Sequence, residues 1–416
     1  MPETESSKLY KKTIPERLDF LKQACGLDDA DLELLSKTGT LGLENAQRLS
    51  ENVVGCYELP FAIATNFVVN GKPVLVPMVI EEPSVVAAAS NAAKLSEGFT
   101  AKTTEPLMIG QIQLVKVKDF ARAKKNILKK QKEILSLANR QDSTLVKFGG
   151  GAKKIEVRKI GKGKKTMLIV HLIVDVRDAM GANAINTMCE KITPVLEELS
   201  GGKARLRILS NLAIYRLATV KTVWKKETLG EETIDAILDA YEFAKNDVFR
   251  ATTNNKGIMN GVDAVVIATG NDFRAVEAGA HSYAAFKGKY RPLADYWKNK
   301  KGDLEAELTM PLAVGTIGGA TRTHPLAKLS LKIMGVKNAQ ELAGIIASVG
   351  LANNFAAMRA LATEGIQRGH MKLHSKNIAV TAGAKGDQVE KIAVQMAAEG
   401  NVSVSRAKEL LEQTKP

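Results

Sequence analysis

The stretch GIMNGVDAVVIATGNDFRAVEAGAH, from Gly257 to His281, directly follows Lys256 and surrounds a short apolar run with amide, carboxylate and basic side chains. The apolar run, Val262 to Ala268, predicts a buried strand in the core of the fold. Polar groups at both ends of a buried element are costly unless they pair with one another or with a ligand. The stretch therefore indicates a functional site built on a core element.

The composition is that of a globular protein with room for a sizeable core. The chain has 416 residues, of which 45% are hydrophobic and 25% charged, and this length predicts two or three domains. The N-terminal MPETESSKLYKK lacks the apolar region of a signal peptide, and no run of about 18 uninterrupted apolar residues predicts a transmembrane helix. The three widely spaced cysteines, Cys25, Cys56 and Cys189, argue against a disulfide framework or a zinc site and favour a cytoplasmic location.

Two lysine-rich runs contribute much of the net charge of +14, one from Lys116 to Lys132 and one from Lys153 to Lys165. Such runs are typical either of nucleic-acid binding or of a solvated helix face and a lysine-rich hairpin. No aromatic residues alternate with the lysines as a stacking surface would require, and no recognition motif accompanies them. We therefore expect no nucleic-acid partner.

The order of predicted elements indicates an α+β fold with an insertion. Residues 15–48 are predicted to be helical with a break at Gly26, residues 66–80 to form a hairpin around an Asn-Gly turn, and a helix to begin near Pro83. Residues 106–214 have a different β/α alternation, which predicts a small domain between two parts of a larger one, 1–105 and 215–364. The remainder, 365–416, is predicted to be helix and loop.

Three segments carry carboxylate or ammonium groups that are candidates for catalysis. Glu81 and Glu82 lie between the predicted hairpin and the next helix, where a carboxylate is either a helix cap or a general acid. Lys256, among asparagines, is either part of a surface turn or a cation for a developing oxyanion. Asp272, at the end of the predicted strand, either caps the following helix or belongs to a site.

Two further segments carry possible chemistry. His370 and His374 have the i, i+4 spacing of a metal-binding pair, but no acidic cluster accompanies them, so we expect no metal and favour a general-acid histidine. The segment DVRDAMGAN, 175–183, follows a predicted strand and opens a predicted helix, so its backbone amides can cradle an anion. It lacks the G-x-G-x-x-G pattern of a Rossmann fold.

Together these segments resemble the class II 3-hydroxy-3-methylglutaryl-CoA reductases, the soluble enzymes of bacteria and some archaea. The resemblance covers nearly the whole chain in the same order. It is carried by ENVVG (51–55), IEEPSVVAAAS (80–90), DAMGAN (178–183), NNKGIMNGVDAV (254–265), ATGND (268–272) and ATEGIQRGHM (362–371).

The resemblance implies reduction of a thioester to an alcohol by two nicotinamide hydrides, giving mevalonate and free CoA through a thiohemiacetal and an aldehyde. It implies that Lys256 stabilises the oxyanion, that Glu82 donates a proton to it, and that Asp272 joins both in one network. His370 would protonate the departing thiolate from a mobile C-terminal flap, 365–416, that closes over the substrate.

The resemblance also implies the binding residues. Arg250 would hold the free carboxylate of the substrate, Ser84 and Asn260 would contact the same end, and Lys11 would contact a CoA phosphate. The dinucleotide would bind a small ferredoxin-like, non-Rossmann domain through Asp178, Met180, Gly181, Ala182 and Asn183. Asp142 would lie against the adenosine ribose and favour NADH over NADPH, although Arg140 and Lys147 nearby oppose this preference.

The family further implies a homodimer with the active site at its interface and ENVVG in the contact, or a trimer of such dimers. Two rival hypotheses remain. A different nicotinamide-dependent acyl-CoA or aldehyde reductase would act without depending on Arg250, and a nucleic-acid-binding protein would bind through residues 116–165 in a salt-sensitive way.

Overall fold

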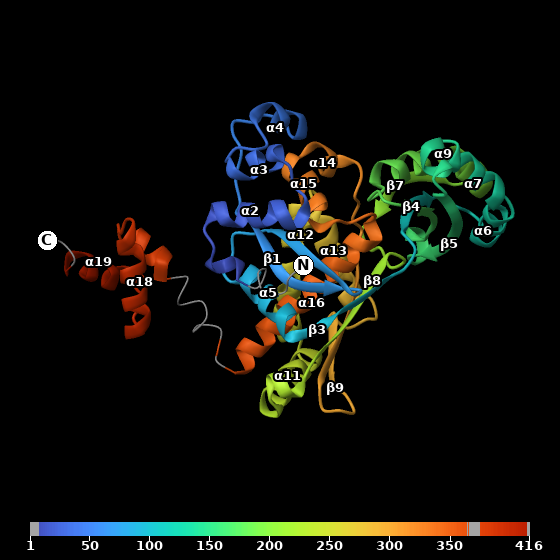
Figure 1. Ribbon diagram of the computed structural model, residues 1–416. Helices are drawn as coiled ribbons and strands as arrows, with labels where there is room; N and C mark the ends of the chain where they lie inside the picture. The colour runs from blue at the N-terminus through green and yellow to red at the C-terminus, as the bar shows by residue number, and fades with distance from the viewer. Residues whose placement is uncertain (1–7, 364, 366–374, 414–416) are drawn as a thin grey trace.

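The computed structural model describes residues 8–363, 365 and 375–413, and its strands form two separate open sheets (Figure 1). The larger sheet has six strands in the order β2-β1-β3-β8-β10-β9. The smaller sheet has four strands in the order β5-β6-β4-β7. With helices around both, the protein has the α+β fold that the sequence predicts.

The larger sheet begins with the predicted hairpin. Asn70 and Gly71 both have positive φ, 51° and 76°, as the two-residue type I′ turn requires, so the strands pair from Val69 opposite Lys72 onward. The strands of this sheet are β1 (Phe61–Val69), β2 (Lys72–Val79), β3 (Ser96–Thr103), β8 (Leu217–Trp224), β9 (Ala294–Lys298) and β10 (Leu304–Pro311).

Helices around this sheet bury its apolar residues in one large core, and the N-terminal helices pack in a second, smaller cluster. At the N-terminus, the predicted helical region consists of a 3-10 turn η1 (Leu9–Lys11), α2 (Ile14–Cys25), α3 (Asp29–Ser36) and α4 (Leu43–Leu49), with the predicted break at Gly26 in the left-handed conformation. The other helices are α5 (Val85–Leu95), α10 (Lys226–Leu229), α11 (Glu231–Asn246), α12 (Val248–Ala268), α13 (Phe273–Ala285), α14 (Gly319–Thr323), α15 (Pro325–Met334) and α16 (Ala339–Ala362).

The predicted strand at Val262–Ala268 is wrong, because these residues form the last turns of the 21-residue helix α12. A short apolar run cannot distinguish a strand from a helix that is buried on most of its surface, and α12 packs against α16, α11, α5, α13 and β2. Gly261 permits the close approach of α16, since a Cβ there would lie 2.8 Å from the carbonyl oxygen of Val349. The helical period places Lys256 and Asn260 on one face.

The smaller sheet is formed entirely by the inserted segment. Its strands are β4 (Leu107–Val115), β5 (Gly151–Ile160), β6 (Met167–Asp175) and β7 (Lys203–Ser210), all antiparallel, and its helices are α6 (Phe120–Lys129), α7 (Gln131–Asn139), α8 (Ser143–Lys147) and α9 (Ala182–Ser200), with a 3-10 turn η2 (Gly163–Lys165). The chain order βαββαβ with this strand order is the ferredoxin-like topology. The lysine-rich runs lie largely on α6, α7 and the β5–β6 hairpin.

The last described segment forms a third unit. Helices α18 (Asp387–Glu399) and α19 (Val404–Gln413) share a small apolar cluster, and Figure 1 shows them apart from both sheets. We propose domain boundaries that follow these three units, at 106–214 for the insertion and 365–416 for the C-terminal part, because each unit has its own apolar cluster.

One described helix, α16, is long and apolar enough to cross a membrane by length and composition. However, 67% of its apolar window is buried within the protein, where it packs against α12, α5, β3 and β8. Its apolar character is therefore that of a core helix.

Candidate functional site

Glu82 and Lys256, 174 residues apart in the chain, form a direct ion pair. The Lys256 Nζ donates to Glu82 Oε2 over 2.8 Å, and Asn260 Nδ2 lies 3.5 Å from the same oxygen. Lys256 and Asn260 reach it from one face of α12, while Glu82 lies between β2 and α5. The side chains of Lys256 and Glu82 remain 60% and 34% exposed. The pair therefore places a cation and a carboxylate side by side where a ligand can reach both.

Asp272 has the capping role that was one of its two interpretations. Its side chain accepts a hydrogen bond from the Ala275 amide over 3.1 Å at the start of α13, and its Oδ1 lies 3.2 Å from Arg274 Nη2. Within the described part of one chain its recorded partners do not include Lys256 or Glu82. The three-residue network implied by the resemblance is therefore only partly assembled in a single chain.

Arg250 and Ser84 lie at the starts of two different helices, α12 and α5. Arg250 is half-buried in the first turn of α12, where burial lowers the pKa of its guanidinium, and its amide donates to Asp247 Oδ1 over 2.7 Å. Ser84 is the N-cap residue of α5 and has φ 73°, a left-handed conformation that is uncommon for serine. His370 and His374 lie outside the described residues.

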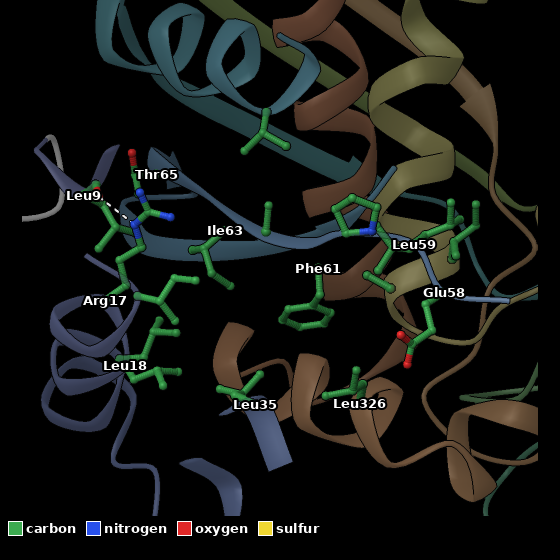
Figure 2. Close-up of a pocket in the computed structure, with 18 of the residues that line it drawn as sticks. Leu9, Arg17, Leu18, Leu35, Glu58, Leu59, Phe61, Ile63, Thr65 and Leu326 are labelled. Carbon is green, nitrogen blue, oxygen red and sulfur yellow. Dashed lines mark hydrogen bonds between the residues drawn. The ribbon is translucent and has the colours of Figure 1, made fainter. Parts of the chain in front are cut away.

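A cavity of about 1250 Å³ separates the N-terminal helices from β1 and α5, and Ser84 and Lys11 both line it. Figure 2 shows Leu18, Leu35 and Phe61 around its interior, with Arg17 and Glu58 at opposite sides of the view. The basic side chains in its lining are Lys8, Lys11, Arg17, Lys37 and Lys94. A large, partly apolar cavity with several cations in its lining fits a ligand with an apolar arm and an anionic end.

The segment 178–183 forms the turn between β6 and α9. Gly181 has φ 95°, and a Cβ there would lie 2.4 Å from Val176 Cγ1, so a larger residue does not fit. No side chain caps the 19-residue helix α9, which begins at Ala182. The N–H groups of its first turn are therefore not capped by a side chain and are suited to bind an anion. This part of the chain thus has the features expected of a phosphate cradle.

Two of the predicted cofactor residues, Asp178 and Asp142, have structural partners as well. Asp178 Oδ1 accepts from the Ala339 amide over 2.9 Å at the start of α16. Asp142 is the N-cap of α8, where its Oδ1 accepts from the Leu145 amide over 2.8 Å. Each carboxylate keeps a second oxygen, so capping does not prevent contact with a ligand.

Sequence reasoning missed a second loop, which lies beside the turn 178–183. Ala179 pairs with Ile317 in an isolated parallel bridge, and the Thr316 amide donates to the Asp178 carbonyl over 2.8 Å. The segment 314–319, VGTIGG, therefore lies beside the cradle. Its run of small and glycine residues was the available signal. Arg216 and Asn271, which hold this loop, were also not assigned.

Comparisons with known proteins point to one family. The family model described as hydroxymethylglutaryl-coenzyme A reductase matches residues 13–375. A 3-hydroxy-3-methylglutaryl-coenzyme A reductase of Archaeoglobus fulgidus is 55% identical over 97% of this chain and 93% of its own length. A probable enzyme of the same name from Borreliella burgdorferi is 37% identical over 79% of this chain and 77% of its own length.

Solved structures lead to the same group. The class II 3-hydroxy-3-methylglutaryl-CoA reductase of Streptococcus pneumoniae, bound to NADPH in open conformations, has a TM-score of 0.83 and 42% identity over 97% of this chain and 99% of its own. A second structure of the enzyme from that organism has a TM-score of 0.84 and 41% identity over 98% and 99%. The chain therefore has the fold of class II enzymes and belongs to the hydroxymethylglutaryl-coenzyme A reductase family.

Proposed function

We propose that the protein reduces 3-hydroxy-3-methylglutaryl-CoA to mevalonate and free CoA, with oxidation of two NAD(P)H per turnover. The observation that carries this proposal is the Lys256–Glu82 pair, 2.8 Å apart and open on one side. When bound, the reduced dinucleotide supplies the hydride, and the protein has to manage the charges and protons that accompany it.

The side chains divide this work by their chemistry. Lys256 stabilises the negative charge that develops on the thioester oxygen, and Glu82 donates the proton that neutralises it. Asn260, 3.5 Å from Glu82 Oε2, orients the same oxygen. His370 protonates the departing CoA thiolate, which suits an imidazolium near neutral pH. Arg250 binds the free carboxylate of the substrate with its guanidinium fork.

The cavity lined by Lys11 and Ser84 suits the CoA part of the substrate. Four of its basic lining residues, Lys8, Lys11, Arg17 and Lys37, belong to the N-terminal segment, where phosphates would bind, and Ser84 is two residues from Glu82. A ligand running along it would therefore bring its acyl end to the ion pair.

The turn 178–183 fits the dinucleotide. Its uncapped helix N-terminus and the closely packed Gly181 suit a pyrophosphate, so Asp178, Met180, Gly181, Ala182 and Asn183 would hold the cofactor. We propose NADH as the preferred form, because the Asp142 carboxylate would accept from a ribose hydroxyl and repel a 2′-phosphate. The related Streptococcus pneumoniae enzyme has been solved with NADPH, so this preference is a property to be measured.

A homodimer would complete the site. Asp272 is engaged in capping and with Arg274 rather than with the Lys256–Glu82 pair, which leaves the pair open to a group from a second subunit. Val54 and Tyr57, in and beside the ENVVG motif, are 100% and 90% exposed in the single chain, as expected of residues that a partner covers. A trimer of such dimers is a larger form of the same assembly. We also propose a cytoplasmic location, which the three free cysteines favour.

The test is an assay of the purified protein with 3-hydroxy-3-methylglutaryl-CoA and either NADH or NADPH, with a thiol reagent to measure free CoA. The chemistry requires oxidation of two dinucleotides per thiol released. A folded protein that oxidises neither cofactor with this substrate, but turns over another acyl-CoA, would replace the proposal with the rival reductase hypothesis.

A further inference from the structure

Arg216 lies where the chain returns from the smaller sheet to the larger one. The two connections between the sheets, 104–106 and 211–216, run together, because Thr104 Oγ1 donates to the Tyr215 carbonyl over 2.7 Å and accepts from the Leu217 amide over 2.8 Å. Arg216 is 6% exposed at this junction. A cation is costly to bury, so its position has to be explained by what it binds.

The guanidinium of Arg216 joins the two loops of the cofactor cradle. Nη2 donates to the Val314 carbonyl over 2.6 Å, and Nη1 donates to the Ala179 carbonyl over 3.0 Å. The carbonyls of Arg177 and Met180 lie at 3.5 Å. Among the described residues, Arg216 therefore reaches four carbonyl groups, three of them in the turn before α9.

Carbonyl groups that turn toward Arg216 fix the direction of the adjacent amides. In a trans peptide the C=O and the following N–H point in opposite directions. The amides that follow Ala179 and Met180 therefore point away from the guanidinium. Through this geometry Arg216 sets the orientation of the peptides that lead into the N-terminus of α9.

Asn271 holds the second loop from the other side. Its Oδ1 accepts from the Gly315 amide over 2.7 Å and its Nδ2 donates to the Gly315 carbonyl over 3.1 Å. Gly315 presses on the cradle so closely that a Cβ there would lie 2.8 Å from the Met180 nitrogen. Asn271 directly precedes Asp272, the N-cap residue of α13. The pairing of Asn271 with Gly315 therefore connects the junction of α12 and α13 to the cofactor turn.

We propose that Arg216 and Asn271 are positioning residues. Together they hold residues 177–181, at the start of the cofactor turn, and the loop 314–318 in place beside the end of α12. The two residues thereby set where the dinucleotide is held relative to Lys256. This inference rests on the proposed role of the 178–183 turn in binding the dinucleotide.

The test compares two conservative variants with a matched control. Arg216→Lys keeps the charge but cannot span both loops, and Asn271→Asp keeps the acceptor for the Gly315 amide but loses the donor. Asn70 makes the same two-bond pairing with a distant peptide, since Nδ2 donates to the Ala101 carbonyl over 3.0 Å and Oδ1 accepts from the Ala101 amide over 2.8 Å. Asn70→Asp therefore removes an equivalent bond away from the cofactor turn.

For each variant, NADH affinity is measured by the fluorescence of the bound dinucleotide, and kcat and the KM for 3-hydroxy-3-methylglutaryl-CoA are measured in the steady state. We expect Arg216→Lys and Asn271→Asp to weaken NADH binding about tenfold, the scale of a lost hydrogen bond to a charged or buried group, and to lower kcat. The KM for the acyl-CoA should stay close to that of the unchanged protein. Asn70→Asp should leave NADH affinity, kcat and KM unchanged. The melting temperature of each variant reports any effect on folding.

Gly181→Ala separates this inference from the proposal on which it rests, because its methyl group disturbs the turn directly. If Gly181→Ala loses NADH binding while Arg216→Lys and Asn271→Asp bind NADH normally, the positioning role is refuted and the turn assignment stands. If Gly181→Ala also binds normally, both are refuted. If Arg216→Lys does not fold, Asn271→Asp with its Asn70→Asp control decides the question.

Discussion

Replacing Lys256 with alanine should separate catalysis from stability. We expect the substitution to change the free energy of unfolding little and the rate of reduction strongly. The pair that Lys256 forms with Glu82 is short, at 2.8 Å, but the lysine side chain is 60% exposed and the glutamate 34%. Ion pairs this open to water contribute no more than about 1 kcal/mol to the free energy of unfolding. The melting temperature should therefore fall by no more than about 2–4 °C.

The expected effect on the rate is far larger. Removing one preorganised group that stabilises an oxyanion lowers kcat by about 10²–10³-fold, which corresponds to about 2.7–4 kcal/mol of transition-state stabilisation. The stopped-flow or steady-state assay follows dinucleotide oxidation, and calorimetry follows unfolding. The free energy lost from the transition state should thus exceed the free energy lost from the fold several times over.

The chain offers a closely matched control for this comparison. Lys221 and Glu307 form an ion pair of 2.6 Å between β8 and β10, with side chains that are 61% and 31% exposed. Lys221→Ala removes a pair of the same kind from the larger sheet, so it should change stability as little as Lys256→Ala and leave kcat intact. A Lys256→Ala protein that turns over at the same rate as Lys221→Ala would refute the oxyanion role.

Three further predictions follow from particular contacts. Asp142→Asn retains the cap on the Leu145 amide but removes the charge, so the ratio of kcat/KM with NADPH to that with NADH should rise about tenfold; an unchanged ratio would assign cofactor choice elsewhere. Burial, together with the neighbouring Glu277, raises the pKa of Asp263 to about 8. The stability that its protonated form provides is therefore complete below its unfolded pKa, about 4, and is lost as pH rises through 8. Asp263→Asn should flatten the decline in melting temperature over that range, and an equally steep decline would contradict the assignment. Ser84→Gly should raise the melting temperature by relieving a left-handed serine while raising the KM for the acyl-CoA, whereas Ser84→Ala should raise the KM without the gain in stability.

Elements whose signals are local could be predicted from the sequence. The Asn70–Gly71 turn, the break at Gly26 and the alternation from β5 to β7 depend on turn residues and short-range periodicity, and the structure confirms them. Strand β4, one of the two inner strands of the smaller sheet, was not predicted, because its polar Gln111 and Gln113 interrupt the apolar run. The error at Val262–Ala268 has a related cause, since burial on most of a helix surface erases its period.

The candidate site was predictable to the extent that its chemistry lies in side chains. The resemblance brought Glu82 and Lys256 together in advance of any contact, and the structure confirms their proximity, while their catalytic roles remain predictions. Hydrophobic periodicity alone does not predict a contact between two residues 174 positions apart. Asp272 shows the opposite case, because its local capping role could be read from the Asn-Asp sequence before α13, but its proposed partners could not.

Arg216 and Asn271 could not be identified as site residues from sequence motifs. Every contact that Arg216 makes in the cradle is to a carbonyl oxygen, and the principal pairing of Asn271 is to the peptide of Gly315. Main-chain acceptors are present at every residue, so the partner positions carry no side-chain signature and a lone arginine gives no indication of its targets. A buried arginine at the crossing of two interdomain connections becomes informative only when the fold brings loops 37 and 98 residues away against it.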